Sequence, residues 1–143
     1  MWTEPEESRG EVVRCVPSLD VDLDGAPGSE GRARSAARCF LGGLAGLGRG
    51  RLSPQTRQDA VLVVSELVCN ACRHAPGPCR LTMVVGDEGV EIAVEDTSSE
   101  LLDPAGRPGP SGYGLFVVAT IGHRVHAART ATGKIVETVV PNR

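Results

Sequence analysis

Aromatic residues are scarce in this chain of 143 residues, where they make up 3% of the sequence. An excess of basic residues is missing too, because 15 Lys and Arg stand against 18 Asp and Glu, which gives a net charge of −3. Proteins that bind nucleic acid usually present a basic face, and those that bind single strands add stacking aromatic rings. We therefore expect no direct nucleic-acid partner, and a core built mainly from Val, Leu, Ala and Ile.

Long apolar runs are absent as well. The longest run, Ala60 to Val64, is far shorter than the roughly 20 residues that span a bilayer. The N-terminal stretch MWTEPEESRGE is acidic and lacks the basic-then-apolar order of a secretory signal. We expect a cytoplasmic protein with no membrane partner. Its five cysteines are then expected to be reduced thiols, and their odd number argues against a closed disulfide framework.

The cysteines allow one further interpretation, a zinc site. Cys69 and Cys72 are separated by two residues, and His74 and Cys79 follow. Structural zinc sites usually place such a pair on a turn and add a second pair. Here the pair falls inside an expected helix and no second pair follows, so buried thiols that pack a helix are the favoured interpretation.

The order of the expected elements predicts the fold class. Residues 1–10 are expected to be a flexible tail, residues 11–143 a single domain, and SLDVDLDGAPGSEG a connection within it. Ser53 and Pro54 are a suitable N-cap and first residue of a helix. Hydrophobic spacing and turn signals predict strands at 11–17, 80–85, 90–94, 123–128 and 134–140, and helices at 32–47, 54–74 and 113–121. This order favours an α+β two-layer sandwich, with helices on one face of a mainly antiparallel mixed sheet.

The helix expected over 54–74 carries a polar stripe. On a helical wheel, Glu66, Asn70 and Arg73 lie within about 60° of one another, with His74 at the margin. The stripe could simply face water, as on any amphipathic helix. Much of the rest of this helix is apolar, however. Because such a helix is covered on most sides, we favour a stripe that lines a cleft.

The chemistry of the stripe suits a metal ion held together with phosphate. A carboxylate and a carboxamide can serve a divalent cation with oxygen ligands, or a carboxylate base beside a metal ligand. Downstream, in PGPSGYGLFVV, Gly112 and Gly114 precede an apolar helical run, where backbone N–H groups can approach an anion. The spacing does not match a P-loop. Between the two motifs, Asp96 ends a strand in IAVEDTSS, where it could accept a hydrogen bond from a nucleotide base or initiate a turn.

Together, SELVCNACRHA, VEDTSS and SGYGLFVV, in this order and spacing, resemble the histidine-kinase-like ATPase fold, also called the Bergerat or GHKL fold. The chain is most similar to a small bacterial branch of that family, the anti-sigma-factor serine kinases and related regulatory ATP-binding proteins. The resemblance covers residues 32–141 and implies ATP and Mg²⁺ as cofactors. It also implies an anti-sigma-factor antagonist protein and a sigma factor as partners, in a partner-switching circuit. Relatives of this kind are often homodimers.

The resemblance implies a role for each motif residue. Glu66 would be the general base that orients a partner hydroxyl or water, and Asn70 would ligate the Mg²⁺ that bridges the phosphates. Asp96 would bind the adenine amino group, and residues 97–111 would form the lid over ATP. The other implied nucleotide contacts are Arg73, His74, Gly112, Tyr113, Gly114 and Leu115.

Two functional classes stay open at this point. Glu66 favours an enzyme, a protein serine/threonine kinase that phosphorylates the antagonist and binds the sigma factor, because a pure binder needs no base. Family members often have Asp-x-Gly where this chain has Asp96-Thr97-Ser98, and a Thr where Ile135 stands. These differences favour the alternative, a non-catalytic ATP-binding or nucleotide-free protein-interaction module.

Overall fold

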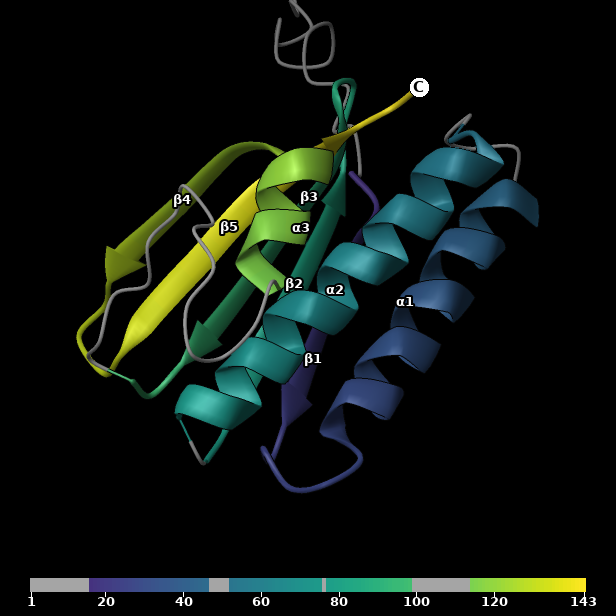
Figure 1. The fold of residues 1–143 in the computed structure, drawn as a ribbon. Coiled ribbons are helices and arrows are strands. Elements are labelled where there is room, and N and C mark those ends of the chain that lie inside the picture. The colour runs from purple at the N-terminus through teal and green to yellow at the C-terminus, as the bar shows by residue number, and fades with distance from the viewer. Residues whose placement is uncertain (1–15, 47–51, 76, 99–113) are drawn as a thin grey trace, which may run out of the picture.

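The computed structural model describes residues 16–46, 52–75, 77–98 and 114–143. Within them the elements are β1 (Ser18–Leu23), α1 (Ser29–Gly46), α2 (Pro54–His74), β2 (Cys79–Val85), β3 (Gly89–Asp96), α3 (Gly114–Ile121), β4 (His123–Arg129) and β5 (Lys134–Pro141). The helices cover one face of the sheet (Figure 1). This arrangement confirms the predicted α+β two-layer sandwich.

The sheet has the strand order β1-β2-β3-β5-β4, and every pair of neighbouring strands is antiparallel. The sheet of the described residues is therefore antiparallel throughout, in agreement with the predicted mainly antiparallel sheet. The physical reason is that short turns connect β2 to β3 and β4 to β5, which forces each of these pairs to run in opposite directions. Strand β5 then lies between β3 and β4.

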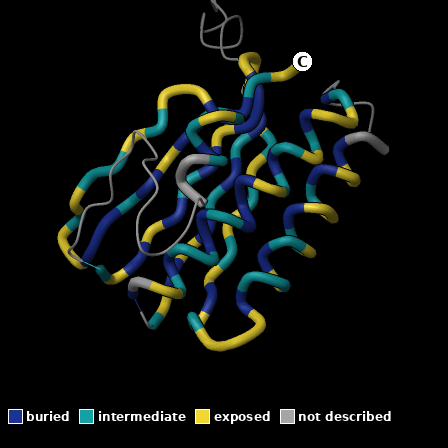
Figure 2. Tube along the Cα trace, in the orientation of Figure 1, coloured by how far each residue is buried: buried dark blue, intermediate teal, exposed yellow. Residues whose placement is uncertain are grey.

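The core lies between the sheet and the helices, where Figure 2 shows the buried segments facing each other. Alternate residues of the strands point into it, as the burial of Leu81 and Met83 in β2 and of Ile92 and Val94 in β3 shows. Helix α2 supplies its broad apolar face, namely Ala60, Val63, Val64, Leu67, Val68 and Ala71. Phe40 is only partly buried beside this cluster, so the core formed by the described residues is mainly aliphatic, as the composition predicts.

The first strand differs from the prediction. Strand β1 covers Ser18–Leu23, which was expected to be a connection, and residues 11–15 of the strand expected at 11–17 lie outside the described residues. Leu19, Val21 and Leu23 alternate with aspartates in this strand, and the alternation suits an edge strand with one face toward the core. These two aspartates, with Asp24 directly after the strand, made the segment look like a turn, because Asp is depleted in strands.

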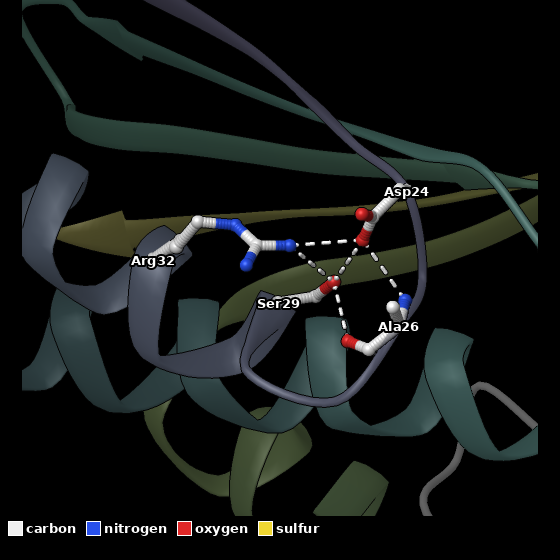
Figure 3. Close-up of polar contacts among 4 residues, drawn as sticks. All are labelled: Asp24, Ala26, Ser29 and Arg32. Atoms are coloured by element: carbon white, nitrogen blue, oxygen red, sulfur yellow. Dashed lines mark hydrogen bonds and ion pairs between the residues drawn. The ribbon is translucent and has the colours of Figure 1, made fainter.

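A polar network precedes α1, which begins three residues earlier than predicted (Figure 3). The Asp24 carboxylate accepts hydrogen bonds from the Ala26 backbone N–H at 2.9 Å and from the Arg32 guanidinium at 2.9 Å. The Ser29 hydroxyl lies 3.1 Å from the same carboxylate oxygen and 2.8 Å from the Ala26 carbonyl. The Ala26 N–H, followed by the Ser29 hydroxyl, lowers the pKa of Asp24 from its ordinary value of 3.8. The network therefore favours an ionised Asp24 at the entrance to α1.

Helix α2 begins as predicted. Ser53 is its N-cap and accepts a hydrogen bond from the Thr56 backbone N–H at 3.1 Å, and Pro54 is the first helical residue. The Ser53 N–H donates to Asn142 Oδ1 at 3.2 Å, and the Arg143 N–H donates to Thr56 Oγ1 at 2.9 Å. The last residues of the chain thus satisfy polar groups at the start of α2, which fixes that end of the helix against β5.

No helix among the described residues combines the length and the apolar character that crossing a membrane requires.

Candidate functional site

Helix α2 lies between α1 and α3 on the sheet (Figure 1). Ser65 marks the flank toward α1, because its hydroxyl donates to Glu30 Oε1 of α1 at 2.8 Å. On the helical wheel Asn70 lies about 140° from Ser65, and the buried residues of α2 occupy the wider arc that separates the two. Glu66 lies about 40° from Asn70. The predicted stripe is therefore on the flank of α2 that faces α3.

The stripe is neither fully buried nor fully exposed. Glu66 and Asn70 are half-buried, whereas Arg73, one turn further along, is exposed. Within the described part of the chain, the side chains of Glu66 and Asn70 make no hydrogen bond or ion pair. Their oxygen atoms can therefore receive a ligand without first losing a protein partner. His74 is the last residue of α2, and its side chain lies outside the description.

Helix α3 brings its N-terminus next to α2 (Figure 1). Gly114 and Leu115 are its first two residues, while Gly112 and Tyr113 lie outside the described residues. The first N–H groups of a helix have no partner within it, and together with the helix dipole they favour an anion. The Asn70 flank of α2 and the start of α3 thus offer oxygen ligands for a cation beside backbone donors for an anion.

Asp96, the last residue of β3, points inward and lies opposite Lys134, the first residue of β5. The Lys134 ammonium donates to Asp96 Oδ2 at 2.7 Å, and the two side chains are 1% and 3% exposed. The other carboxylate oxygen, Oδ1, accepts the backbone N–H of Ser98 at 2.8 Å. Asp96 therefore initiates a turn, which is one of the two interpretations left open for it. It also takes part in a buried ion pair that the sequence did not predict.

Lys134 was not among the residues singled out from the sequence, where attention fell on its neighbour Ile135. Ile135 is paired with Glu95 and points away from Asp96, because successive residues of a strand face opposite sides of the sheet. The position that faces Asp96 is Lys134. The sequence does indicate that Lys134 faces inward, because it is separated by an even number of positions from Val136 and Val140, which face the core. Its importance becomes visible only once β5 is known to pair with β3.

Gly133 precedes Lys134 and lets the two backbones approach at this point. A Cβ atom at Gly133 would collide with the backbone carbonyl of Asp96 and with Thr97. The close approach holds the β4–β5 turn against the end of β3. It thereby places Lys134 beside Asp96.

The cysteines do not assemble a metal site among the described residues, which hold no group of three or more potential His, Cys, Asp or Glu ligands. Cys39, Cys69, Cys72 and Cys79 are free thiols. Burial, and then the neighbouring Cys72, raises the pKa of Cys79 to about 11. Burial, and then the Glu30 carboxylate, also raises the pKa of Cys69. Both thiols are therefore protonated at neutral pH and suited to packing.

A family model of the histidine kinase-like ATPase domain matches residues 28–140 of the chain. The chain belongs to this family. No curated protein matches it closely enough to report. Among solved structures, the fold is similar to the crystal structure of the RsbU and RsbW domains of Rv1364c from Mycobacterium tuberculosis, with a TM-score of 0.61 and 20% sequence identity. That match covers 89% of this chain and 33% of the other, so this histidine kinase-like ATPase domain spans a third of its structural neighbour.

An ATPase domain of this family implies a nucleotide, usually with Mg²⁺, and the residues of the site fit both. Asn70 offers a carboxamide oxygen and Glu66 a carboxylate, both half-buried, and oxygen atoms are the ligands that Mg²⁺ prefers. Gly114 begins the neighbouring helix without a Cβ atom that would keep a phosphate away from its backbone. Asp96 is the last residue of β3, a strand that packs against α2, and its side chain is buried.

Proposed function

We propose that this protein binds Mg·ATP and acts as an anti-sigma-factor-type serine/threonine kinase, which phosphorylates an antagonist protein and binds a sigma factor. The observation that carries the proposal is the flank of α2 beside α3, where Glu66 and Asn70 lie one turn apart and half-buried. Membership of the histidine kinase-like ATPase family and the fold shared with a structure that contains an RsbW domain support it. A homodimer in the cytoplasm is part of the same proposal.

Each side chain has a defined task in this proposal. Asn70 Oδ1 ligates Mg²⁺, and the N–H groups at the start of α3 hold phosphate oxygens. Asp96 accepts a hydrogen bond from the base. Glu66 orients the hydroxyl group of the antagonist and accepts the proton that this hydroxyl loses, as a general base does. When bound, ATP would supply the γ-phosphoryl group that this hydroxyl receives, and ADP would be released. Arg73, exposed on the last turn of α2, is placed to attract phosphate.

The first test is calorimetric titration of the protein with ATP, with and without Mg²⁺, beside the variant Asn70→Ala. Binding should require Mg²⁺ and fall by about tenfold or more in the variant, since a metal ligand is lost. Asn70→Asp is the matched control, because it keeps an oxygen ligand for the metal. Binding that is indifferent to both Mg²⁺ and Asn70 would refute the assignment of the metal site.

The second test separates binding from catalysis. Radiolabelled ATP and purified candidate antagonist proteins are incubated with the unmodified protein and with Glu66→Gln. The variant should lose phosphotransfer by about 100-fold or more, because a carboxamide cannot accept the proton. Its affinity for Mg·ATP should stay nearly unchanged. Equal phosphorylation by both proteins would show that Glu66 is not the base.

The alternative function is a protein-interaction module that binds ATP without catalysis or does not bind it. The Asp96–Lys134 ion pair favours it, because both carboxylate oxygens of Asp96 already have protein donors. This alternative predicts that the protein contacts its partners equally well with and without ATP. Co-elution with a sigma factor that persists after nucleotide removal, together with no heat of ATP binding, would favour the module over the kinase.

A further inference from the structure

The buried ion pair of Asp96 and Lys134 has hydrogen-bonding capacity left over. A lysine ammonium carries three N–H donors, and one of them is directed at Asp96 Oδ2. Within the described part of the chain, the ammonium has no second acceptor. The carboxylate has accepted one hydrogen bond on each oxygen, and each oxygen can accept another. A buried donor without an acceptor costs free energy, so a group that supplies one is stabilised at this position.

The pair presents two neighbouring atoms of opposite character. Nζ of Lys134 donates, and Oδ2 of Asp96, 2.7 Å away, accepts. The six-membered ring of a purine carries the complementary pattern on its edge. In adenine the 6-amino group donates and N1 accepts, whereas in hypoxanthine and guanine the 6-oxygen accepts and N1–H donates. A carboxylate alone matches only the donating part of each edge.

The added ammonium changes which bases can be matched. With Asp96 alone, the 6-oxygen of hypoxanthine would meet a negative charge and no donor. With Lys134 beside it, that oxygen can accept from the ammonium while N1–H donates to the carboxylate. Adenine uses the same two groups in the reverse order along its edge, with the 6-amino group at the carboxylate and N1 at the ammonium, so the two bases bind the pair in different orientations. The pair thus removes the feature by which a lone carboxylate rejects a 6-oxopurine.

We propose that Lys134 is a specificity-determining residue of the base site, and that the Asp96–Lys134 pair accepts 6-oxopurine nucleotides such as ITP as well as adenine nucleotides. This inference rests on the proposed function, because it places the nucleotide base at Asp96. It goes beyond that function by naming the class of base and the residue that sets it. Lys134 is a positioning and recognition residue with no role in phosphotransfer.

The test is a calorimetric comparison of Mg·ATP and Mg·ITP on the unmodified protein. The two nucleotides differ only in the 6-substituent and the N1 proton. The dissociation constant of ITP should lie within about tenfold of that of ATP, because both bases find two partners. A larger preference for ATP overturns the inference while leaving the proposed function intact. If neither nucleotide binds, the proposed function and this inference fail together.

Variants of Lys134 show whether this residue is responsible for ITP binding. Lys134→Thr should weaken the binding of ITP by about tenfold or more relative to that of ATP, because the 6-oxygen loses a charged donor while the adenine amino group keeps Asp96. Lys134→Arg keeps a cation with several donors and should retain ITP binding. Titration with tripolyphosphate is the control, because it measures the affinity that the phosphates alone provide. Equal changes in ITP and ATP affinity in Lys134→Thr would overturn the inference.

Folding of the variants does not limit the test. Circular dichroism shows whether Lys134→Thr keeps the native helix content. If it does not, the ITP-to-ATP ratio of the unmodified protein and that of Lys134→Arg decide the matter. A loss of ITP binding in a folded Lys134→Arg, with ATP binding retained, would also count against recognition by a general cationic donor.

Discussion

Two ion pairs of nearly the same length occupy opposite environments in this protein. Lys134 and Asp96 are 2.7 Å apart and 1% and 3% exposed, whereas Arg32 and Asp24 are 2.9 Å apart and 54% and 69% exposed. Water can replace either partner of the exposed pair but neither partner of the buried pair. The N–O distance of an ion pair therefore does not determine how much stability is lost when the pair is broken, whereas its burial does.

The largest effect is expected from Lys134→Met, which leaves the Asp96 carboxylate buried without its cation. The free energy of unfolding should fall by about 3–5 kcal/mol, measured by urea denaturation. The double variant Asp96→Asn with Lys134→Met removes both charges and keeps an acceptor for the Ser98 N–H. It should recover most of the lost stability. If the single and double variants are equally unstable, packing and not charge explains the effect.

The second-largest loss of stability is expected at Gly133, where two backbone segments approach closely beside the buried ion pair. Gly133→Ala places a Cβ atom against the carbonyl of Asp96, and such overpacking should cost about 1–3 kcal/mol in the free energy of unfolding. Gly42→Ala is the matched control, because nothing lies within 4 Å of its Cβ position in α1. There the same change should stabilise the protein by about 0.5–1 kcal/mol. Thermal denaturation of both variants should show shifts of opposite sign.

Removing a half-buried polar contact should cost less unfolding free energy than breaking the buried ion pair and more than breaking the exposed one. Ser53→Ala removes the side chain that accepts the Thr56 N–H at the start of α2, and its expected cost is about 1 kcal/mol in the free energy of unfolding. Ser53→Asp restores an acceptor at the N-cap and should cost much less. Urea denaturation distinguishes the two. Equal losses would mean that the cap contact itself contributes nothing.

The smallest effect is expected at the exposed pair, and it should depend on pH. The folded state lowers the pKa of Asp24 from 3.8, so its contribution to stability is complete above that value and disappears as the pH falls through the lower, folded-state pKa. Asp24→Asn should therefore lower the Tm near neutral pH, and the difference from the unmodified protein should shrink under acid. Arg32→Met should keep most of this pH dependence, because the Ala26 N–H is the first cause of the shift. A difference in Tm that does not change with pH would contradict the assignment.

Local patterns were enough to predict much of the fold and part of the candidate site. The start of α2 at Ser53 and Pro54 follows from short-range chemistry, and so does the hairpin through Gly86 and Gly89. The polar stripe of α2 follows from helical spacing alone. In each case the deciding residues are near neighbours along the chain.

What the sequence could not predict depends on pairing between distant segments. Strand β1 carries two aspartates and is recognisable only beside β2, where Asp20 lies near Thr82 and Arg80. Lys134 matters because the register places it opposite Asp96, 38 residues away along the chain. No local pattern contains that register, because it is set jointly by the turn at Gly133 and the packing of β5 between two other strands.

The position of β5 between β3 and β4 has a consequence for synthesis. Strands β1, β2 and β3 leave the ribosome first, and the outer edge of β3 has no partner until β5 follows. An unpaired strand edge invites pairing with other chains. During translation, the backbone edge of β3 that later pairs with β5 is therefore open to such pairing. The strand that closes the sheet, β5, also delivers the cation that neutralises Asp96.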